Sequence, residues 1–143
     1  MSTSRRSALG LKIGQVAQES GLSVKTIRFY TEADLLNPVM RRSPSGYRLF
    51  DPDVFNRLAF IKRSQALGLS LRDIHDLLMV HDGGTLPCGA IKERLQQKLD
   101  NIHAQIANLE ILRLELEGIL SGWEDQPPAH LIERTICPNL QQP

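Results

Sequence analysis

The feature that most constrains this chain is a heptad pattern of aliphatic residues near its C-terminal end. The side chains recur at alternating intervals of four and three residues, which is the spacing of the a and d positions of a coiled coil. The series is Leu95, Leu99, Ile102, Ile106, Leu109, Leu116 and Leu120. A helix over 89–121 would be about 50 Å long, too long for a small preceding domain to cover. The pattern therefore predicts pairing with the same helix of a second chain.

Arg113 interrupts this series at a position that should be apolar. Three interpretations stay open. The two helices could diverge there, the guanidinium could bind an acidic partner, or Arg113 could extend past the seam while Leu112 packs in its place.

The residues ahead of the long helix predict a helix-turn-helix. Val16 marks the apolar face of a first short helix, and Gly21 can supply a left-handed turn. Ser23 can then cap a second helix, whose inner face carries Ile27 and, we expect, Phe29. Alone, this spacing fits any hairpin of two helices.

The stretch "NPVMRRSPSGYRLFDPDVF" predicts a wing, because Pro, Ser and Gly flank short apolar pieces as in a small β-ribbon with a basic tip. A helix should follow from Asp51 and Pro52 to Gly68. Another should begin at the capping-box spacing of Ser70 and Asp73. Gly83 and Gly84 end that helix and form a hinge, beside which His81 and Asp82 are expected as an exposed pair at the helix end.

The charge of the chain is divided unevenly. Residues 1–72 carry twelve Lys and Arg against five Asp and Glu, a net charge of +7, whereas residues 73–143 carry five against eleven, a net charge of −6. This division points to a front half that binds a polyanion. We expect no enzyme, because no phosphate loop, nucleophile elbow or HExxH spacing is present.

Two further observations bear on the location of the protein. No apolar run approaches the roughly 20 residues that a membrane span needs, and the N-terminal residues lack the apolar region of a secretory signal. The content of 41% hydrophobic and 23% charged residues is ordinary for a soluble protein. The cytoplasm is the expected location, with no membrane partner.

Three blocks of sequence, "IGQVAQESGLSVKTIRFYTEADLL", "RRSPSGYRLFDPDV" and "RLAFIKRSQALGLSLRDI", resemble the MerR family of transcriptional regulators in their order and spacing. With that resemblance the expected fold is mainly α. A flexible arm over 1–11 precedes a winged helix-turn-helix DNA-binding domain over 12–81, followed by a hinge over 82–88. A dimerisation helix over 89–121 forms an antiparallel coiled coil in the dimer, and a C-terminal effector loop covers 122–143.

The resemblance implies a homodimer that binds double-stranded promoter DNA with an unusually long spacer. On sensing its effector, such a regulator bends and underwinds the promoter so that RNA polymerase can engage it.

The predicted DNA-binding residues lie on the second helix and on the wing. The helix from Ser23 to Glu32 should project four side chains toward the major groove, and the wing should bring four to the DNA backbone. They are Lys25, Thr26, Arg28 and Tyr30 on the helix, and Arg41, Arg42, Tyr47 and Arg48 on the wing. For Tyr30 and Tyr47, core packing of the ring is the alternative. Arg5 and Arg6 of the arm either touch DNA or stay disordered.

The chain has two cysteines, Cys88 and Cys137. In the divalent-metal sensors that the chain resembles, a cysteine typically starts the dimerisation helix, which is the position of Cys88. The tail loop of those sensors usually contributes two more, and Cys137 followed by proline resembles the second. The first is missing here, and His130 stands close to its place.

Three hypotheses for the cysteines stay open. In the first, Cys88 of one chain and Cys137 with His130 of the other hold Zn²⁺, Cd²⁺, Hg²⁺ or a similar thiophilic ion as effector. In the second, Cys88 is a redox-sensitive thiol that Cys137 resolves. In the third, both thiols are inert and the regulator answers to something else.

Overall fold

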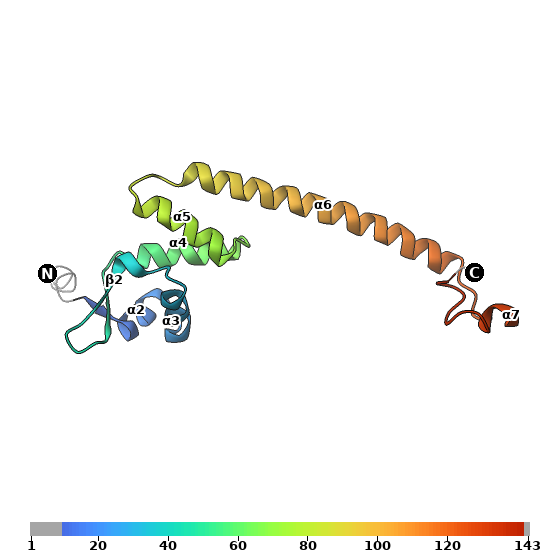
Figure 1. Ribbon diagram of the computed structural model, residues 1–143, viewed down its shortest axis with the longest axis horizontal. Helices are drawn as coiled ribbons and strands as arrows, with labels where there is room; N and C mark the ends of the chain where they lie inside the picture. Colours follow the sequence, from blue (N-terminus) through green and yellow to red (C-terminus); the bar gives the residue numbers. More distant parts are fainter. Residues whose placement is uncertain (1–9, 142–143) are drawn as a thin grey trace. The chain divides into compact units, whose positions relative to one another are not determined.

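The computed structural model describes residues 10–141. Its elements are, in chain order, β1 (Leu11–Lys12), α2 (Ile13–Ser20), α3 (Val24–Glu32), the 3₁₀ turn η1 (Asn37–Val39), β2 (Met40–Arg42), β3 (Arg48–Phe50), α4 (Val54–Ala66), α5 (Leu71–Asp82), α6 (Cys88–Ser121) and α7 (Ala129–Ile132) (Figure 1). They form two compact units, Met1–Arg94 and Leu95–Pro143. The predicted mainly α fold, with a winged helix-turn-helix ahead of a long helix, is confirmed.

The helix-turn-helix is formed by α2 and α3, and its turn follows the predicted chemistry. Gly21 has a φ of 76°, and its N–H donates to the carbonyl of Ala17 at 3.0 Å. Ser23 Oγ accepts from the N–H of Thr26 at 3.0 Å and so caps α3. These two residues set where one helix ends and the next begins.

The wing belongs to a three-stranded antiparallel sheet with the order β1-β3-β2. Leu11 of β1 and Met40 of β2 both pair with Phe50 of β3. The strand β1 was not predicted. Leu11 is fully buried in the sheet although it falls in the arm expected over 1–11, and the rest of that arm up to residue 9, with Arg5 and Arg6, lies outside the described residues.

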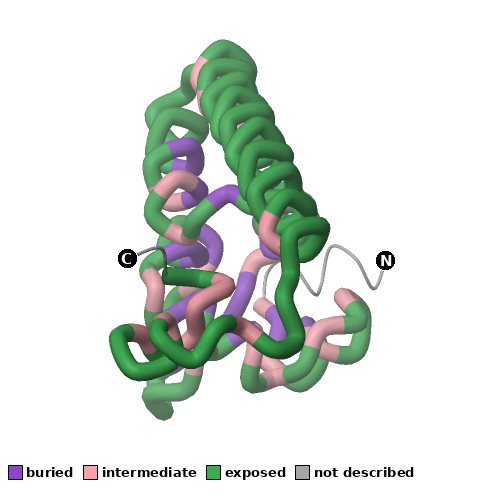
Figure 2. The backbone as a smooth tube through the Cα atoms, turned by 90° about the vertical axis from the view of Figure 1, so that its right-hand side faces the viewer, coloured by how far each residue is buried: buried purple, intermediate pink, exposed green. Residues whose placement is uncertain are grey.

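The core of the first unit lies where α2 and α3 pack with α4, α5 and the sheet. It consists of aliphatic side chains with the aromatic rings of Tyr30 and Phe50, and Figure 2 shows the buried positions in purple. The fully buried members are Leu11, Val16, Ile27, Leu35, Leu36, Phe50, Val54, Leu58, Ile61, Ile74 and Leu77.

The helix α6 spans 34 residues, and none of them is buried. The green colour of the long helix in Figure 2 shows this exposure along nearly its whole length. The aliphatic residues of the heptad series are exposed except Leu95, which is half-buried. The exposed ones are Leu99, Ile102, Ile106, Leu109, Leu116 and Leu120. Arg113 forms ion pairs with Glu110 and, at 3.8 Å, with Glu117, so its acidic partners in one chain lie on its own helix.

The C-terminal loop after α6 is held together by hydrogen bonds between its two limbs. The N–H of Glu124 donates to Asn139 Oδ1 at 2.8 Å, and Asn139 Nδ2 donates to the carbonyl of Glu124 at 2.9 Å. The short helix α7 lies between these limbs in sequence. Among the helices of residues 10–141, none is both long and apolar enough to span a membrane.

Candidate DNA-binding surface and effector residues

The outer face of α3 carries Lys25, Arg28, Phe29 and Glu32, all exposed. Their spacing of three and four residues places them on one stripe of the helix. Phe29 was expected in the core, but 49% of it is exposed. The reason is its position four residues after Lys25, on the face opposite Ile27. We call these four residues the recognition stripe.

Tyr30 was predicted to project toward DNA, and the structure corrects this. It follows Ile27 by three residues, so it shares the buried face and is only 5% exposed. Its hydroxyl donates to Gln65 Oε1 of α4 at 2.5 Å, and burial raises the pKa of that hydroxyl. Tyr30 therefore fixes α3 against α4. Thr26 is half-buried, and its Oγ1 lies 2.9 Å from Ser23 Oγ.

A cleft of about 280 Å³ lies between the first turns of the helix-turn-helix and the wing. Four cationic side chains and an aromatic ring line it, together with Ile13; they are Lys12, Arg28, Arg42, Arg48 and Tyr47. We call this the basic cleft. Since phosphate groups bind where several Lys and Arg converge, the cleft can hold a polyanion backbone.

Contacts within the basic cleft orient its side chains. Lys12 Nζ lies 5.1 Å from the centroid of the Tyr47 ring, and Arg42 Nη1 donates to the carbonyl of Gly46 at 2.8 Å. Tyr47 is exposed, so core packing does not apply to it. Arg48 Nε is buried, and within residues 10–141 no partner accepts its hydrogen bond.

Lys12 was not among the predicted DNA-binding residues, and the predicted contact of Arg41 with the DNA backbone stays a prediction. Lys12 comes to the cleft because β1 pairs with β3, a contact without a local sequence signal. Arg41 is exposed, but it does not line the basic cleft. Its guanidinium packs over Gly10, where an added Cβ would lie 2.9 Å from Arg41 Nη2.

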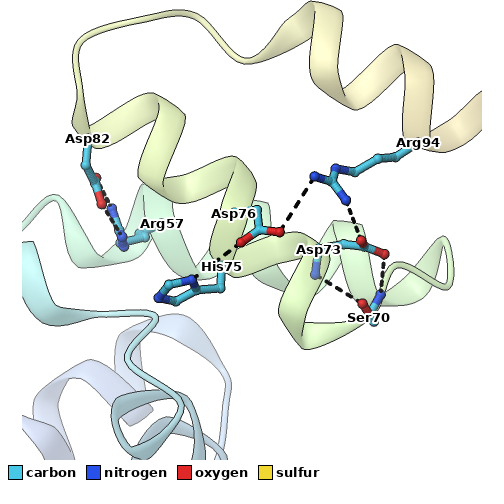
Figure 3. Close-up of polar contacts among 7 residues, drawn as sticks. All are labelled: Arg57, Ser70, Asp73, His75, Asp76, Asp82 and Arg94. Atoms are coloured by element: carbon cyan, nitrogen blue, oxygen red, sulfur yellow. Dashed lines mark hydrogen bonds and ion pairs between the residues drawn. The ribbon is translucent and has the colours of Figure 1, made fainter.

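A polar network joins α4, α5 and the first turns of α6 within the first unit (Figure 3). Arg57 Nη1 and Nη2 donate to Asp82 Oδ1 and Oδ2 at 2.6 and 2.9 Å. Hydrogen bonds from Arg57 hold the pKa of Asp82 below its usual value, against the opposing effect of burial. The predicted pair of His81 and Asp82 at the helix end is exposed, but Asp82 also has a partner across the fold, Arg57.

The second part of this network holds the start of α6. Arg94 Nη1 donates to Asp73 Oδ1 at 2.5 Å, and Arg94 Nη2 lies 3.7 Å from Asp76 Oδ2. Asp73 also completes the capping box with Ser70, as predicted. Burial would raise the pKa of Asp73, but its hydrogen bonds with Ser70 and the charge of Arg94 outweigh burial and lower it.

The predicted effector residues fall in different units of the chain. Cys88 is the exposed first residue of α6 and lines a cavity of about 280 Å³ with Phe60, Leu77 and other residues of the first unit. Cys137 is half-buried in the C-terminal loop, where its N–H donates to Gln141 Oε1 at 3.1 Å. His130 is exposed on α7.

Two thiolates and an imidazole are a donor set that thiophilic ions prefer, so these residues suit such an ion chemically. Within one chain, the described residues contain no group of three His, Cys, Asp or Glu side chains placed to hold a metal.

Comparison with known families gives two matches that together cover most of the chain. The model described as MerR HTH family regulatory protein matches residues 11–79, and the model described as MerR, DNA binding matches residues 55–119. The mercuric resistance operon regulatory protein of Bacillus cereus is 34% identical over 117 residues, which covers 82% of this chain and 85% of that protein.

Two solved structures are similar in fold. The transcription regulator PbrR691 from Ralstonia metallidurans CH34, in complex with lead(II), has a TM-score of 0.68 at 28% identity and covers 82% of this chain and 91% of its own. HiNmlR, a MerR family regulator lacking the sensor domain and bound to promoter DNA, has a TM-score of 0.51 at 26% identity, with 78% and 88% covered. The chain belongs to the MerR family of DNA-binding transcriptional regulators.

Proposed function

We propose that this protein is a homodimeric activator that distorts a long-spacer promoter when a thiophilic metal ion binds to it. The observation that carries the promoter part is the position of the basic cleft beside the recognition stripe, because Arg28 belongs to both. Such a surface supplies phosphate contacts for affinity and base contacts for sequence. HiNmlR, which has the same fold, was solved on promoter DNA.

The exposed heptad series of α6 supports the dimer. A helix that buries none of its apolar side chains in one chain needs a second copy to cover them. Charge favours the antiparallel arrangement. Residues 88–98 of α6 carry Lys92, Arg94 and Lys98 against Glu93, whereas residues 110–121 carry Glu110, Glu115 and Glu117 against Arg113. Antiparallel helices bring these opposite charges together, and a two-fold dimer suits a two-fold DNA site.

The donor set of Cys88, Cys137 and His130 supports a metal effector shared between the two chains. In an antiparallel pair, the start of one α6 lies near the tail that follows the other, so Cys88 of one chain would meet the loop of its partner. Relatives with related roles include the mercuric resistance regulator and PbrR691 with its lead(II) ion.

Metal binding can act on the promoter only through a difference in affinity between two states of the dimer. Bending and underwinding a promoter costs on the order of 1–10 kcal/mol. The effector must favour the DNA-distorting state by a comparable amount, and RNA polymerase then engages the altered promoter. The ion pairs of Arg57 with Asp82 and of Arg94 with Asp73 connect α4, α5 and the start of α6, which Cys88 begins, so a change at Cys88 could be passed to α4 and α5 through them.

The test is an anaerobic titration of the reduced dimer with Zn²⁺, Cd²⁺ and Hg²⁺. Cys88→Ser, Cys137→Ser and His130→Ala should each weaken binding, whereas His103→Ala, which changes another exposed histidine, should not. If no ion binds tightly and the thiols instead oxidise reversibly with a change in promoter activity, the redox hypothesis replaces this one.

A mixture of two single variants tests whether the site crosses the dimer. A heterodimer of Cys88→Ser with Cys137→Ser retains one intact cross-chain pair of thiols and no intact pair within a chain. It should recover tight binding at half of the wild-type stoichiometry, while each variant homodimer keeps no intact site and binds only weakly. A heterodimer that binds no ion would contradict the cross-chain site.

A further inference from the structure

The ring of Phe29 occupies an unusual place for an apolar side chain. It lies at the centre of the recognition stripe, between Lys25 and Arg28 on one side and Glu32 on the other, and about half of it is exposed to water. The neighbouring apolar and aromatic side chains of this helix turn, Ile27 and Tyr30, are buried. The ring centroids of Phe29 and Tyr30 are 6.0 Å apart with an interplanar angle of 51°, so the exposed ring and the buried ring are tilted against each other.

The stripe is poorly suited to the DNA backbone at this point. A phosphate repels the carboxylate of Glu32, and a phenyl ring offers a phosphate no hydrogen bond. The neighbouring basic cleft, with Lys12, Arg42 and Arg48, is the part of the surface suited to phosphates. With the cleft on the backbone, Phe29 and Glu32 are left to face the edges of the bases.

The major groove offers an apolar side chain one chemical target. Each base pair presents hydrogen-bond donors and acceptors there, but only thymine adds a methyl group, at its C5 carbon. Phe29 can neither donate nor accept a hydrogen bond, so it cannot distinguish the other groups. Burial against a methyl group removes apolar surface of both partners from water, and this stabilises the complex.

We propose that Phe29 is a specificity-determining residue that recognises the C5-methyl group of one thymine in each promoter half-site. This inference rests on the promoter binding proposed above. Thymine is favoured at that position by the ring alone, and the choice does not involve the charged residues around it. The contribution of Phe29 is therefore independent of salt, in contrast to that of Arg28.

The test uses the full-length dimer and a duplex that it enriches from a random pool. Each thymine of the enriched half-site is replaced in turn by deoxyuridine, which differs only in lacking the methyl group. At one position the replacement should weaken wild-type binding about fourfold, the effect expected for one buried methyl group. The Phe29→Ala variant should bind both duplexes equally, and Phe29→Leu, which stays apolar, should keep part of the preference.

Two controls separate this role from a structural one. Phe29→Ala should leave the salt dependence of binding unchanged, whereas Arg28→Ala should lower the log–log slope by about 0.9, because one phosphate is no longer neutralised. Replacing the critical thymine by 5-methylcytosine should restore part of the affinity that deoxyuridine removes, since the methyl group returns.

The outcomes that overturn the inference differ from those that overturn the proposed function. An enriched half-site without thymine, or an equal effect of deoxyuridine on wild type and Phe29→Ala, removes the role of Phe29 while promoter binding stands. A protein that enriches no duplex removes the promoter binding itself and this inference with it.

Discussion

Arg57 of α4 holds Asp82, the last residue of α5, through two parallel hydrogen bonds of 2.6 and 2.9 Å. The same guanidinium donates from Nε to the carbonyl of Leu35, just after α3, at 2.5 Å. One buried side chain thus links the segment after the helix-turn-helix to the end of α5. The side chain of Arg57 is 7% exposed and that of Asp82 is 28% exposed, so the pair is only partly screened by water.

We expect Asp82→Asn to lower the free energy of unfolding by about 2 kcal/mol, between the values typical of exposed and of buried ion pairs. The amide keeps the shape of the side chain but leaves the Arg57 charge without its counterion. Urea denaturation measures the change. Asp76→Asn is the control, because its side chain is 51% exposed and its nearest arginine nitrogen lies 3.7 Å away. An equal loss of unfolding free energy in both variants would show that the Arg57–Asp82 pair stabilises the fold no more than an exposed ion pair does.

The same pair predicts a dependence of stability on pH. Hydrogen bonds from Arg57 lower the pKa of Asp82 in the folded chain from its ordinary 3.8. Because the folded state then binds fewer protons than the unfolded state, the contribution of the pair is fully present above that value. It is lost as the pH falls through the lower, folded pKa. Urea midpoints measured from neutrality downward should therefore converge for wild type and Asp82→Asn at acid pH, and parallel curves would contradict this.

The basic cleft predicts which residues set the salt dependence of DNA binding. Lys12→Ala and Arg48→Ala should each lower the log–log slope of affinity against salt by about 0.9, because each variant neutralises one phosphate fewer. Lys92→Ala, an exposed lysine outside the cleft, should leave the slope unchanged. Fluorescence anisotropy on a labelled duplex at several salt concentrations gives the slopes. Equal slopes for Lys12→Ala and wild type would remove Lys12 from the interface.

The heptad series predicts that dimer assembly depends on one face of α6. Leu109 belongs to the series and Ile111 does not, yet they are 63% and 64% exposed in one chain. Leu109→Gln should therefore shift the protein toward monomer, because a seam position becomes polar, whereas Ile111→Gln should not. Sedimentation equilibrium distinguishes the two. A larger effect from Ile111→Gln would mean that another face of α6 pairs.

Two glycines near the wing should respond to alanine in opposite directions. Gly10 has a φ of +82°, and an added Cβ would lie 2.9 Å from Arg41 Nη2 and 3.1 Å from Leu49 Cβ, so Gly10→Ala should destabilise the fold by roughly 1–3 kcal/mol. Gly14 lies in α2 with open space at its Cβ, so Gly14→Ala should stabilise by up to about 1 kcal/mol. Thermal unfolding monitored by circular dichroism measures both. A stable Gly10→Ala variant would mean that Arg41 moves aside freely.

The features predicted from sequence are those whose cause lies within a few residues. Gly21 and Ser23 place the turn between α2 and α3, and the bonds of Ser70 with Asp73 form the capping box that their spacing predicted. The heptad series likewise predicted α6 over 89–121, and the observed helix begins one residue earlier, at Cys88.

What the sequence did not reveal depends on contacts between distant residues. Lys12 reaches the basic cleft only because Leu11 pairs with Phe50, and Asp82 gains its partner from α4. The error for Phe29 and Tyr30, which were expected on each other's faces of α3, did not depend on a distant contact. Their spacing from Ile27 does distinguish the two faces of α3, so the exposed ring could have been predicted from helical periodicity alone.

Because α6 is exposed in one chain, the stability of this protein should depend on its concentration. A helix of 34 residues without a buried side chain adds almost no stability of its own to a lone chain. When a second copy supplies the missing contacts, folding of the C-terminal unit and association become one equilibrium, governed by mass action. The melting temperature should then rise with protein concentration. In a cell, newly made chains at low abundance would stay open to proteases for longer, so the copy number of the regulator would itself help to set its lifetime.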